Sequence, residues 1–118
     1  MEDSILLTIQ ERLGGYYNGN SSDFDPDVLT AINTAISVLT QLGVGPTEGF
    51  RITGPYETWD QFITNVSPAR LEMIKDYIYL RVKLIFDPPQ VGGVLNAYKE
   101  TIDELTWRIN VAVDPNHD

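Results

Sequence analysis

At 118 residues and 42% hydrophobic content, the chain is long enough for one domain with a hydrophobic core and too short for two. Its formal net charge of -9 argues against general nucleic-acid binding, because the phosphates of nucleic acids attract basic surfaces. The chain contains no cysteine, which excludes disulfides, thiolate metal ligands and a cysteine nucleophile.

Segments that would direct the chain to a membrane or out of the cell are not expected. No apolar run approaches the roughly 18 residues that a transmembrane helix needs. The N-terminal stretch carries acidic residues where a secretory signal carries basic ones. We therefore expect a protein of cytosolic origin that does not associate with membranes.

Four helices are expected in chain order. They lie near residues 3–13, 26–42, 68–86 and 92–112. The first can be capped by Asp3 or Ser4 and is ended by Gly14. At about three turns it must dock on another element to be stable. Residues 14–23 are rich in Gly, Asn and Ser, which predicts an exposed loop.

The second helix has a strong start signal and a clear stop. Asp25 is a good N-cap, and Pro26 suits the first helical position. Gly43 is expected to end the helix in the left-handed conformation. Apolar and polar side chains separate cleanly around the wheel, which indicates that one face is buried.

Residues 43–67 form an irregular excursion between the second and third helices. Apolar and polar residues alternate over 50–53 before a Gly-Pro turn, so the segment is either a short β-hairpin or an extended loop. Thr58 can then cap a single helical turn. That turn is expected to plug the body of the protein beneath the loop with three side chains, Trp59, Phe62 and Ile63.

The helix expected at 68–86 is the element around which the chain is organised. Ser67 can cap it, and Pro88-Pro89 ends it near Phe86, because neither proline donates a backbone hydrogen bond. On a wheel of about 100° per residue, apolar side chains occupy far more than the minimal stripe. We therefore expect neighbours on several sides of this helix.

Arg81 interrupts the wide apolar arc of the central helix. Removing its charge from water without a partner would be costly. In one interpretation, its methylene stem packs in the core while the guanidinium reaches solvent or a carboxylate. In the other, this face contacts another subunit, where the planar guanidinium can bind a carboxylate with two hydrogen bonds.

The last helix carries apolar residues at three- and four-residue spacing. They are Val91, Val94, Leu95, Tyr98, Ile102, Leu105, Ile109 and Ala112. The short turn before this helix implies that it folds back antiparallel on the central helix. Trp107 falls on the polar side of the wheel, and tryptophan is enriched among interface anchors. Residues 113–118 are expected to be a flexible tail.

No group of residues assembles into an active site by spacing. The one histidine, His117, stands next to the C-terminus, and neither a nucleophile-elbow motif nor a phosphate-binding loop is present. Asp23, Asp25 and Asp27 could hold a hard cation weakly, but helix capping explains two of them. We predict that the protein is not an enzyme and that it uses no cofactor or metal.

Three stretches resemble the small head–tail connector, or adaptor, proteins of long-tailed bacteriophages of Gram-positive hosts. They are LTQLGVGPTEGF at 39–50, YIYLRVKLIFDPP at 77–89 and ELTWRINV at 104–111. The order of elements also matches, and the resemblance covers most of residues 24–111. Asp-Pro-Pro in its context is the most specific part. These motifs are structural and not catalytic.

The resemblance implies a mainly α, single-domain protein over residues 1–118, with a four-helix connector-type bundle. It implies a ring, commonly of twelve copies, beneath the portal protein in the neck of the virion, after assembly in the host cytoplasm. The ring would extend the channel for DNA during packaging and ejection, without sequence-specific binding, and give the next neck or tail-completion protein a platform. The net negative charge would keep the channel wall from gripping DNA.

A ring requires one patch of each subunit to meet a different patch of the next. The candidate residues for contact with another subunit or a partner are Tyr79, Arg81, Lys83, Trp107 and Arg108.

Two alternatives to the connector remain open. One is a small cytosolic helical regulator or inhibitor that binds one host protein through the same aromatic surface. Such a protein would be a monomer or dimer, whereas a connector forms rings on the portal. The other is a different neck component, such as a stopper or tail terminator, for which the sequence would show more strand signal.

Overall fold

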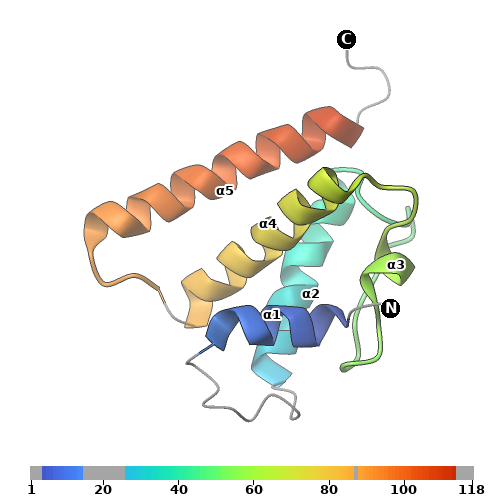
Figure 1. The fold of residues 1–118 in the computed structure, drawn as a ribbon, viewed down its shortest axis with the longest axis horizontal. Helices are drawn as coiled ribbons and strands as arrows, with labels where there is room; N and C mark the ends of the chain where they lie inside the picture. Colours follow the sequence, from blue (N-terminus) through green and yellow to red (C-terminus); the bar gives the residue numbers. More distant parts are fainter. Residues whose placement is uncertain (1–3, 15–25, 87, 114–118) are drawn as a thin grey trace.

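The computed structural model describes residues 4–14, 26–86 and 88–113, and this part of the chain is mainly helical (Figure 1). Its helices are α1 (Ile5–Leu13), α2 (Pro26–Gln41), α3 (Trp59–Phe62), α4 (Pro68–Phe86) and α5 (Gly92–Val113). The four predicted helices are confirmed with small shifts of their ends. The expected count of four is corrected to five within the described residues, because the predicted single turn forms the short helix α3.

The alternative of a β-hairpin in the excursion at 43–67 is not found. The described residues form no strand, and their one isolated bridge joins Ser4 to Thr58. The reason lies at Ile52, whose backbone N–H donates to Asn33 Oδ1 at 2.8 Å and whose C=O accepts from Asn33 Nδ2 at 3.0 Å. Because a side chain on α2 takes both backbone groups, they are not available for a strand partner.

Three predicted N-caps lie within the described residues, and all three are confirmed. Ser4 Oγ accepts a hydrogen bond from the Leu7 N–H at 3.2 Å, and Ser67 Oγ accepts from the Arg70 N–H at 3.2 Å. Thr58 caps α3 in a capping box with Gln61. These contacts explain why three of the helices begin where they do.

Some predictions fall outside the described residues. They are the Asp25 cap, the loop at 14–23 beyond Gly14, the turn residue Asp87, the tail beyond Val113 with His117, and the Asp23 and Asp25 carboxylates.

α4 lies at the centre of the fold and contacts α1, α2 and α5. Figure 1 shows the chain reversing direction between α4 and α5, so that α5 runs back alongside α4. The predicted antiparallel return is therefore confirmed. The expectation of neighbours on several sides of the central helix is confirmed as well, and it explains the wide apolar arc of α4.

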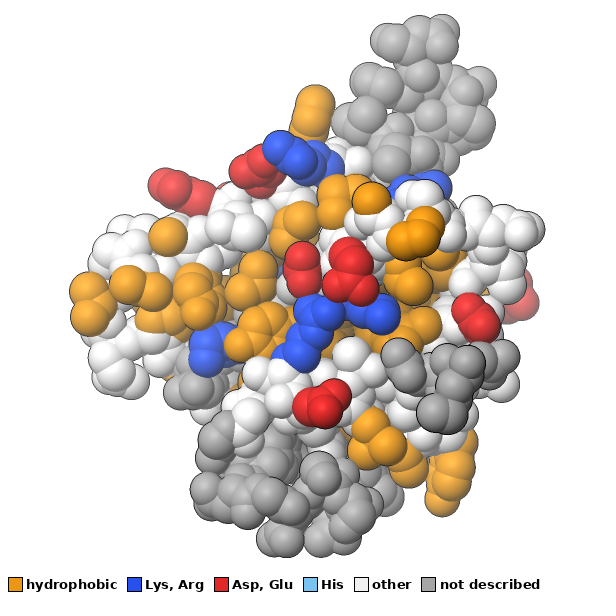
Figure 2. Space-filling model, in the orientation of Figure 1, with side chains coloured by type: hydrophobic (Ala, Val, Ile, Leu, Met, Phe, Trp, Pro, Cys, Tyr) orange, Lys and Arg blue, Asp and Glu red, His pale blue; other side chains and the backbone are white. Residues whose placement is uncertain are grey.

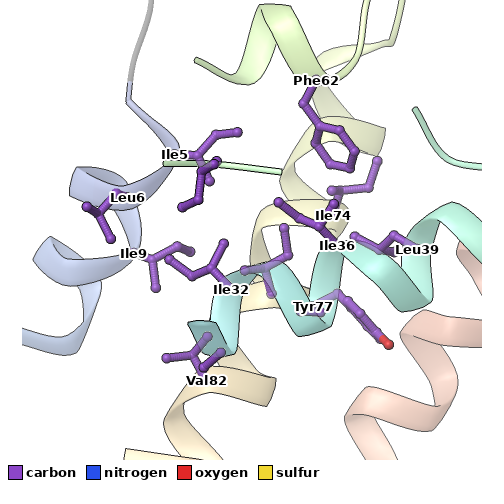
Figure 3. Packing of buried hydrophobic residues seen from close by; sticks show 14 of the residues in the cluster. Ile5, Leu6, Ile9, Ile32, Ile36, Leu39, Phe62, Ile74, Tyr77 and Val82 are labelled. Atoms are coloured by element: carbon purple, nitrogen blue, oxygen red, sulfur yellow. The ribbon is translucent and has the colours of Figure 1, made fainter. Parts of the chain in front are cut away.

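The hydrophobic core is built where α1, α2 and α3 meet α4. Figure 3 shows labelled core side chains from these four helices pointing toward one another. The largest fully buried side chains are Tyr77, Phe62, Ile5, Leu6, Ile9, Ile32, Ile36, Leu39, Ile52, Ile74, Ile78 and Ile109. Each contributes roughly 1.5–3 kcal/mol by leaving water, so this burial dominates the stability of the fold.

The short helix α1 is also tied to α4 by an ion-pair cluster on the surface. Arg12 Nη1 lies 2.8 Å from Asp76 Oδ1, and Arg12 Nη2 lies 3.2 Å from Glu72 Oε1. Figure 2 shows acidic and basic side chains gathered where α1 approaches α4. Because these groups are exposed to solvent, each pair is worth about 0–1 kcal/mol. The cluster orients α1, whereas the buried Ile5, Leu6 and Ile9 hold it in place.

The excursion at 43–67 packs onto the body through its aromatic side chains. Trp59 and Phe62 are buried, and Ile63 packs partly against the core, so the predicted plug is confirmed. The indole Nε1–H of Trp59 donates to Thr8 Oγ1 on α1 at 3.1 Å. The rings of Phe50 and Phe62 stack with their centroids 5.2 Å apart.

Glu57, in the same excursion, gives the fold a dependence on pH. It accepts hydrogen bonds from the N–H and the hydroxyl of Thr53 at 3.0 and 2.8 Å. Burial alone would raise the pKa of Glu57, but the hydrogen bonds from Thr53 and from the backbone of Glu57 and Gly54 together lower it. A lowered folded-state pKa contributes stability above the ordinary pKa, and this contribution disappears as the pH falls through the folded-state pKa.

We expect Glu57→Gln to be less stable than the unchanged protein at neutral pH and to lose stability less steeply on acidification. The free energy of urea unfolding, measured from neutral pH to about pH 3, checks this, because the titration range of glutamate is then covered. Parallel pH curves for the two proteins would contradict the role of Glu57.

Candidate subunit and partner interface

The predicted contact residues on α4 do not form one open surface. Tyr79 and Lys83 are four residues apart and share a face of α4, whereas Arg81 lies about 160° around the helix from Tyr79. All three side chains are half-buried, and Tyr79 packs against the core. Tyr79 and Lys83 are therefore only partly accessible for contact with another chain, because neighbouring helices cover part of their face of α4.

The predicted contact residues on α5 are open to solvent. Trp107 is 65% exposed, so it lies outside the core as its place on the wheel indicates. Arg108 is exposed as well, and its Nη2 lies 2.6 Å from Glu104 Oε2 one turn earlier. Such a pair on an exposed helix is worth about 0.2–0.5 kcal/mol, so Arg108 can exchange it for a partner's carboxylate.

Arg81 contacts the aromatic ring of Tyr77, whereas one expectation was that it pairs with a carboxylate. Its Nη1 donates to the Tyr77 hydroxyl at 3.3 Å, and its guanidinium lies 5.6 Å from the centroid of the Tyr77 ring. No ion pair within the described part of the chain includes Arg81. The interpretation of a packed stem with a partly solvated head fits these contacts.

We expect Arg81→Met to destabilise the fold less than Arg81→Ala, because methionine restores the packing of the stem. The alanine variant should lose about 1–2 kcal/mol, the sum of the stem packing and the contacts with Tyr77. Chemical denaturation measures both values, and Tyr77→Phe, which removes one hydroxyl, is the matched control for the hydrogen bond. If neither Arg81 variant differs from the unchanged protein, the side chain contributes only as a solvated group.

A groove beside Arg81 lies where α2, α4 and α5 meet. Its volume is about 290 Å³, and its lining is Ala31, Thr34, Arg81, Leu84, Ile85, Lys99 and Ile102. Ala31 and Ile102 are buried at its base, whereas Ile85 is 60% exposed at its edge. Sequence reasoning missed this groove because its walls come from three separate helices. Ile85 is the one large hydrophobic side chain of α4 that is exposed, and this exposure marks the groove in the structure.

The first turns of α5 are more exposed than its apolar spacing predicts. Val91 is 65% exposed and Val94 is 43% exposed, although both belong to the predicted buried stripe. Figure 1 shows this end of α5 standing away from α4, and Figure 2 shows hydrophobic side chains gathered over it. The correction is that only the later part of the stripe, around Ile102 and Ile109, is buried within one subunit.

A second cavity, of about 350 Å³, lies at the opposite end of α4. The turn after α2, the segment after α3 and the first turns of α4 line it. Arg70 reaches into this region, and its Nε is buried without a hydrogen-bond partner within the described residues. Its lining residues include Gly43, Val44, Gly45 and Pro46, so the cavity borders the stretch LTQLGVGPTEGF at 39–50.

Two further features are absent from the described residues. Among them, no three His, Cys, Asp or Glu side chains are grouped so that they could hold a metal ion. Within the same ranges, no helix is both long enough and apolar enough to span a bilayer.

The described part of the chain is a small, mainly helical fold with exposed hydrophobic side chains on α5 and a groove between α2, α4 and α5. The sequence of the chain matches the phage connector protein family over residues 5–116. The chain therefore belongs to the phage connector protein family, which supports a structural role as a head–tail connector. No curated protein and no solved structure was found to match it.

Proposed function

We propose that this protein forms a ring beneath the portal in the neck of the virion. The ring extends the channel through which DNA passes and provides the platform for the next neck or tail-completion protein. The observation that carries the proposal is the match to the phage connector family over nearly the whole chain, residues 5–116. Tyr79, Arg81, Lys83, Trp107 and Arg108 remain the candidate contacts, of which the two on α5 are the most accessible.

The attachment of α5 supports this proposal. α5 packs on α4, and of its side chains over residues 92–110, Ile102 and Ile109 are buried. Hydrophobic side chains are exposed toward both ends of the helix, with Val94 and the preceding Val91 at one end and Trp107 at the other. Exposed apolar side chains on a long helix that is attached along one face favour burial against neighbouring subunits.

The negative net charge of the chain also supports the proposed channel. With a net charge of -9 per subunit, a ring would repel the phosphates of passing DNA. Repulsion lets DNA move without being held at the wall. Contact with DNA would thus be independent of sequence.

Electron microscopy of the purified protein, alone and mixed with the portal protein of the same phage, tests the proposal. We expect rings coaxial with the portal and a central channel that continues the portal channel. If the protein stays a monomer or dimer and does not bind the portal, the result would instead favour the alternative of a small regulator. Binding only to portals that already carry another connector would favour a stopper or another neck component.

A further inference from the structure

The groove between α2, α4 and α5 has the composition of a socket for an aromatic side chain. Its base is apolar, with Ala31, Leu84 and Ile102, and Ile85 stands at its edge. Two of the eight basic residues of the chain, Arg81 and Lys99, line the same groove. An apolar site with cations at its walls suits an aromatic ring, because cations are attracted to the ring face.

The size of the groove fits one bicyclic side chain. Its volume of about 290 Å³ is close to twice the roughly 150 Å³ of an engineered cavity that binds benzene. It lies at the lower limit of about 300 Å³ for sites that enclose drug-sized ligands. A single indole is therefore a better match to it than a larger ligand.

The chain itself exposes such a side chain. Trp107 is 65% exposed, and tryptophan is the aromatic residue that attracts cations most strongly. Three exposed acidic residues, Glu100, Asp103 and Glu104, lie within about 60° of Trp107 around α5. Glu104 is paired with Arg108, which leaves the charges of Glu100 and Asp103 beside Trp107. The groove is lined by two basic residues, so the two surfaces are complementary in charge.

Trp107 cannot enter the groove of its own subunit. Ile102, which lines the groove, and Trp107 are both on α5, and at about 100° per residue they lie about 140° apart around the helix. Trp107 does not line the groove of its own subunit, and its indole is exposed to solvent. The groove of another copy of the chain is therefore a site that Trp107 can enter.

We propose that Trp107 of one copy inserts into the groove formed by α2, α4 and α5 of the next copy. The contact joins two different patches, so a chain of subunits keeps one free Trp107 at one end and one free groove at the other. Repetition of this contact closes a ring or extends a filament, according to the rotation between subunits. The proposal rests on the proposed function for its setting, but it concerns self-association that can be measured without the portal.

Sedimentation velocity over a range of protein concentrations tests the contact. We expect the unchanged protein to associate, and Trp107→Ala and Ile85→Glu each to weaken association roughly tenfold or more. Both positions are exposed in the single subunit, so circular dichroism should show an unchanged fold. Tyr56→Ala is the matched control, because Tyr56 is an aromatic residue that is 78% exposed outside both patches. Association of Trp107→Ala at the unchanged strength would overturn the proposal, as would an unchanged protein that stays monomeric up to its solubility limit.

Mixing the two variants gives the sharper result. Trp107→Ala keeps an intact groove, and Ile85→Glu keeps its tryptophan, so the mixture can form one productive contact and no second one. We expect a heterodimer that grows no further. If the mixture stays monomeric although the unchanged protein associates, the two patches do not meet each other and the proposal is wrong.

Tryptophan fluorescence measures the burial of the Trp107 indole on association. Trp59 is buried in the single subunit, so a concentration-dependent blue shift in emission comes from Trp107. We expect this shift in the unchanged protein and in Tyr56→Ala, and its absence would contradict insertion of the indole. If Trp107→Ala still forms rings on the portal, this inference fails while the proposed function stands. Self-association through Trp107 without any portal complex would support this inference and contradict the proposed function.

Discussion

Replacing Gly45 with alanine is expected to lower the free energy of unfolding by about 2–4 kcal/mol, because backbone strain and a steric clash add together. Gly45 has a φ of +83°, a conformation in which a side chain is strained. An added Cβ would also lie 2.6 Å from Cε1 of Phe62. That ring cannot move aside easily, because it is buried and stacks on Phe50.

Gly49 provides the matched control for this substitution. Its φ of +99° carries a similar backbone strain, but an added Cβ would meet nothing within 4 Å. We therefore expect Gly49→Ala to cost about 1–2 kcal/mol, the strain alone. Urea unfolding followed by the fluorescence of the buried Trp59 measures both variants.

A double variant separates the clash from the strain. In a Phe62→Leu background the ring is gone, so Gly45→Ala should cost no more than Gly49→Ala does. If the cost of Gly45→Ala is the same with and without the Phe62 ring, the clash contributes nothing. The result bears on the stretch at 39–50, because it would show that glycine at this place serves the packing of the turn after α2 on α3.

The helices could be predicted because their signals are local. Ser67 and the double proline that follows Phe86 lie beside the ends that they determine, so the bounds of α4 could be read without any distant contact. Thr58 marks α3 for the same reason. The exposure of Trp107 was also predictable, since its place on the wheel separates it from Ile102 and Ile109.

The exposure of the other surface side chains could not be predicted, because it depends on how the helices pack against one another. Val94 has the spacing of a buried residue, yet the spacing shows only which face of α5 is apolar and not whether a neighbour covers it. The groove that Ile85 and Lys99 line requires three helices to meet at one place. Arg81 likewise contacts Tyr77 one turn away, whereas either solvent or a carboxylate was expected from the sequence as its partner.

Asn33 is the clearest residue whose role was hidden in the sequence. On the wheel of α2 it falls among Thr30, Thr34 and Ser37, as an ordinary polar residue. In the fold it is only 6% exposed, and its side chain amide pairs with both backbone groups of Ile52, nineteen positions away in the chain. This pair of hydrogen bonds attaches the excursion at 43–67 to α2.

Asn33→Asp is expected to lower the free energy of unfolding by about 2–4 kcal/mol at neutral pH, although it replaces only the amide group of the side chain. The carboxylate can still accept from the Ile52 N–H. It cannot donate to the Ile52 C=O, and the two oxygens then face each other in a buried site. Asn96→Asp, at an exposed position on α5, is the matched control and should stay within about 0.5 kcal/mol of the unchanged protein.

The pH dependence of the Asn33→Asp variant identifies the missing donor as the cause. Burial beside a carbonyl oxygen should raise the folded-state pKa of the new carboxyl above its ordinary value. A raised pKa means that the protonated acid, which can donate to the Ile52 C=O, fits the fold. Stability should therefore be closest to that of the unchanged protein below about pH 4 and should decline as the pH rises through the folded-state pKa. A deficit that is constant from acid to neutral pH would show that shape, and not the lost hydrogen bond, makes asparagine necessary at this position.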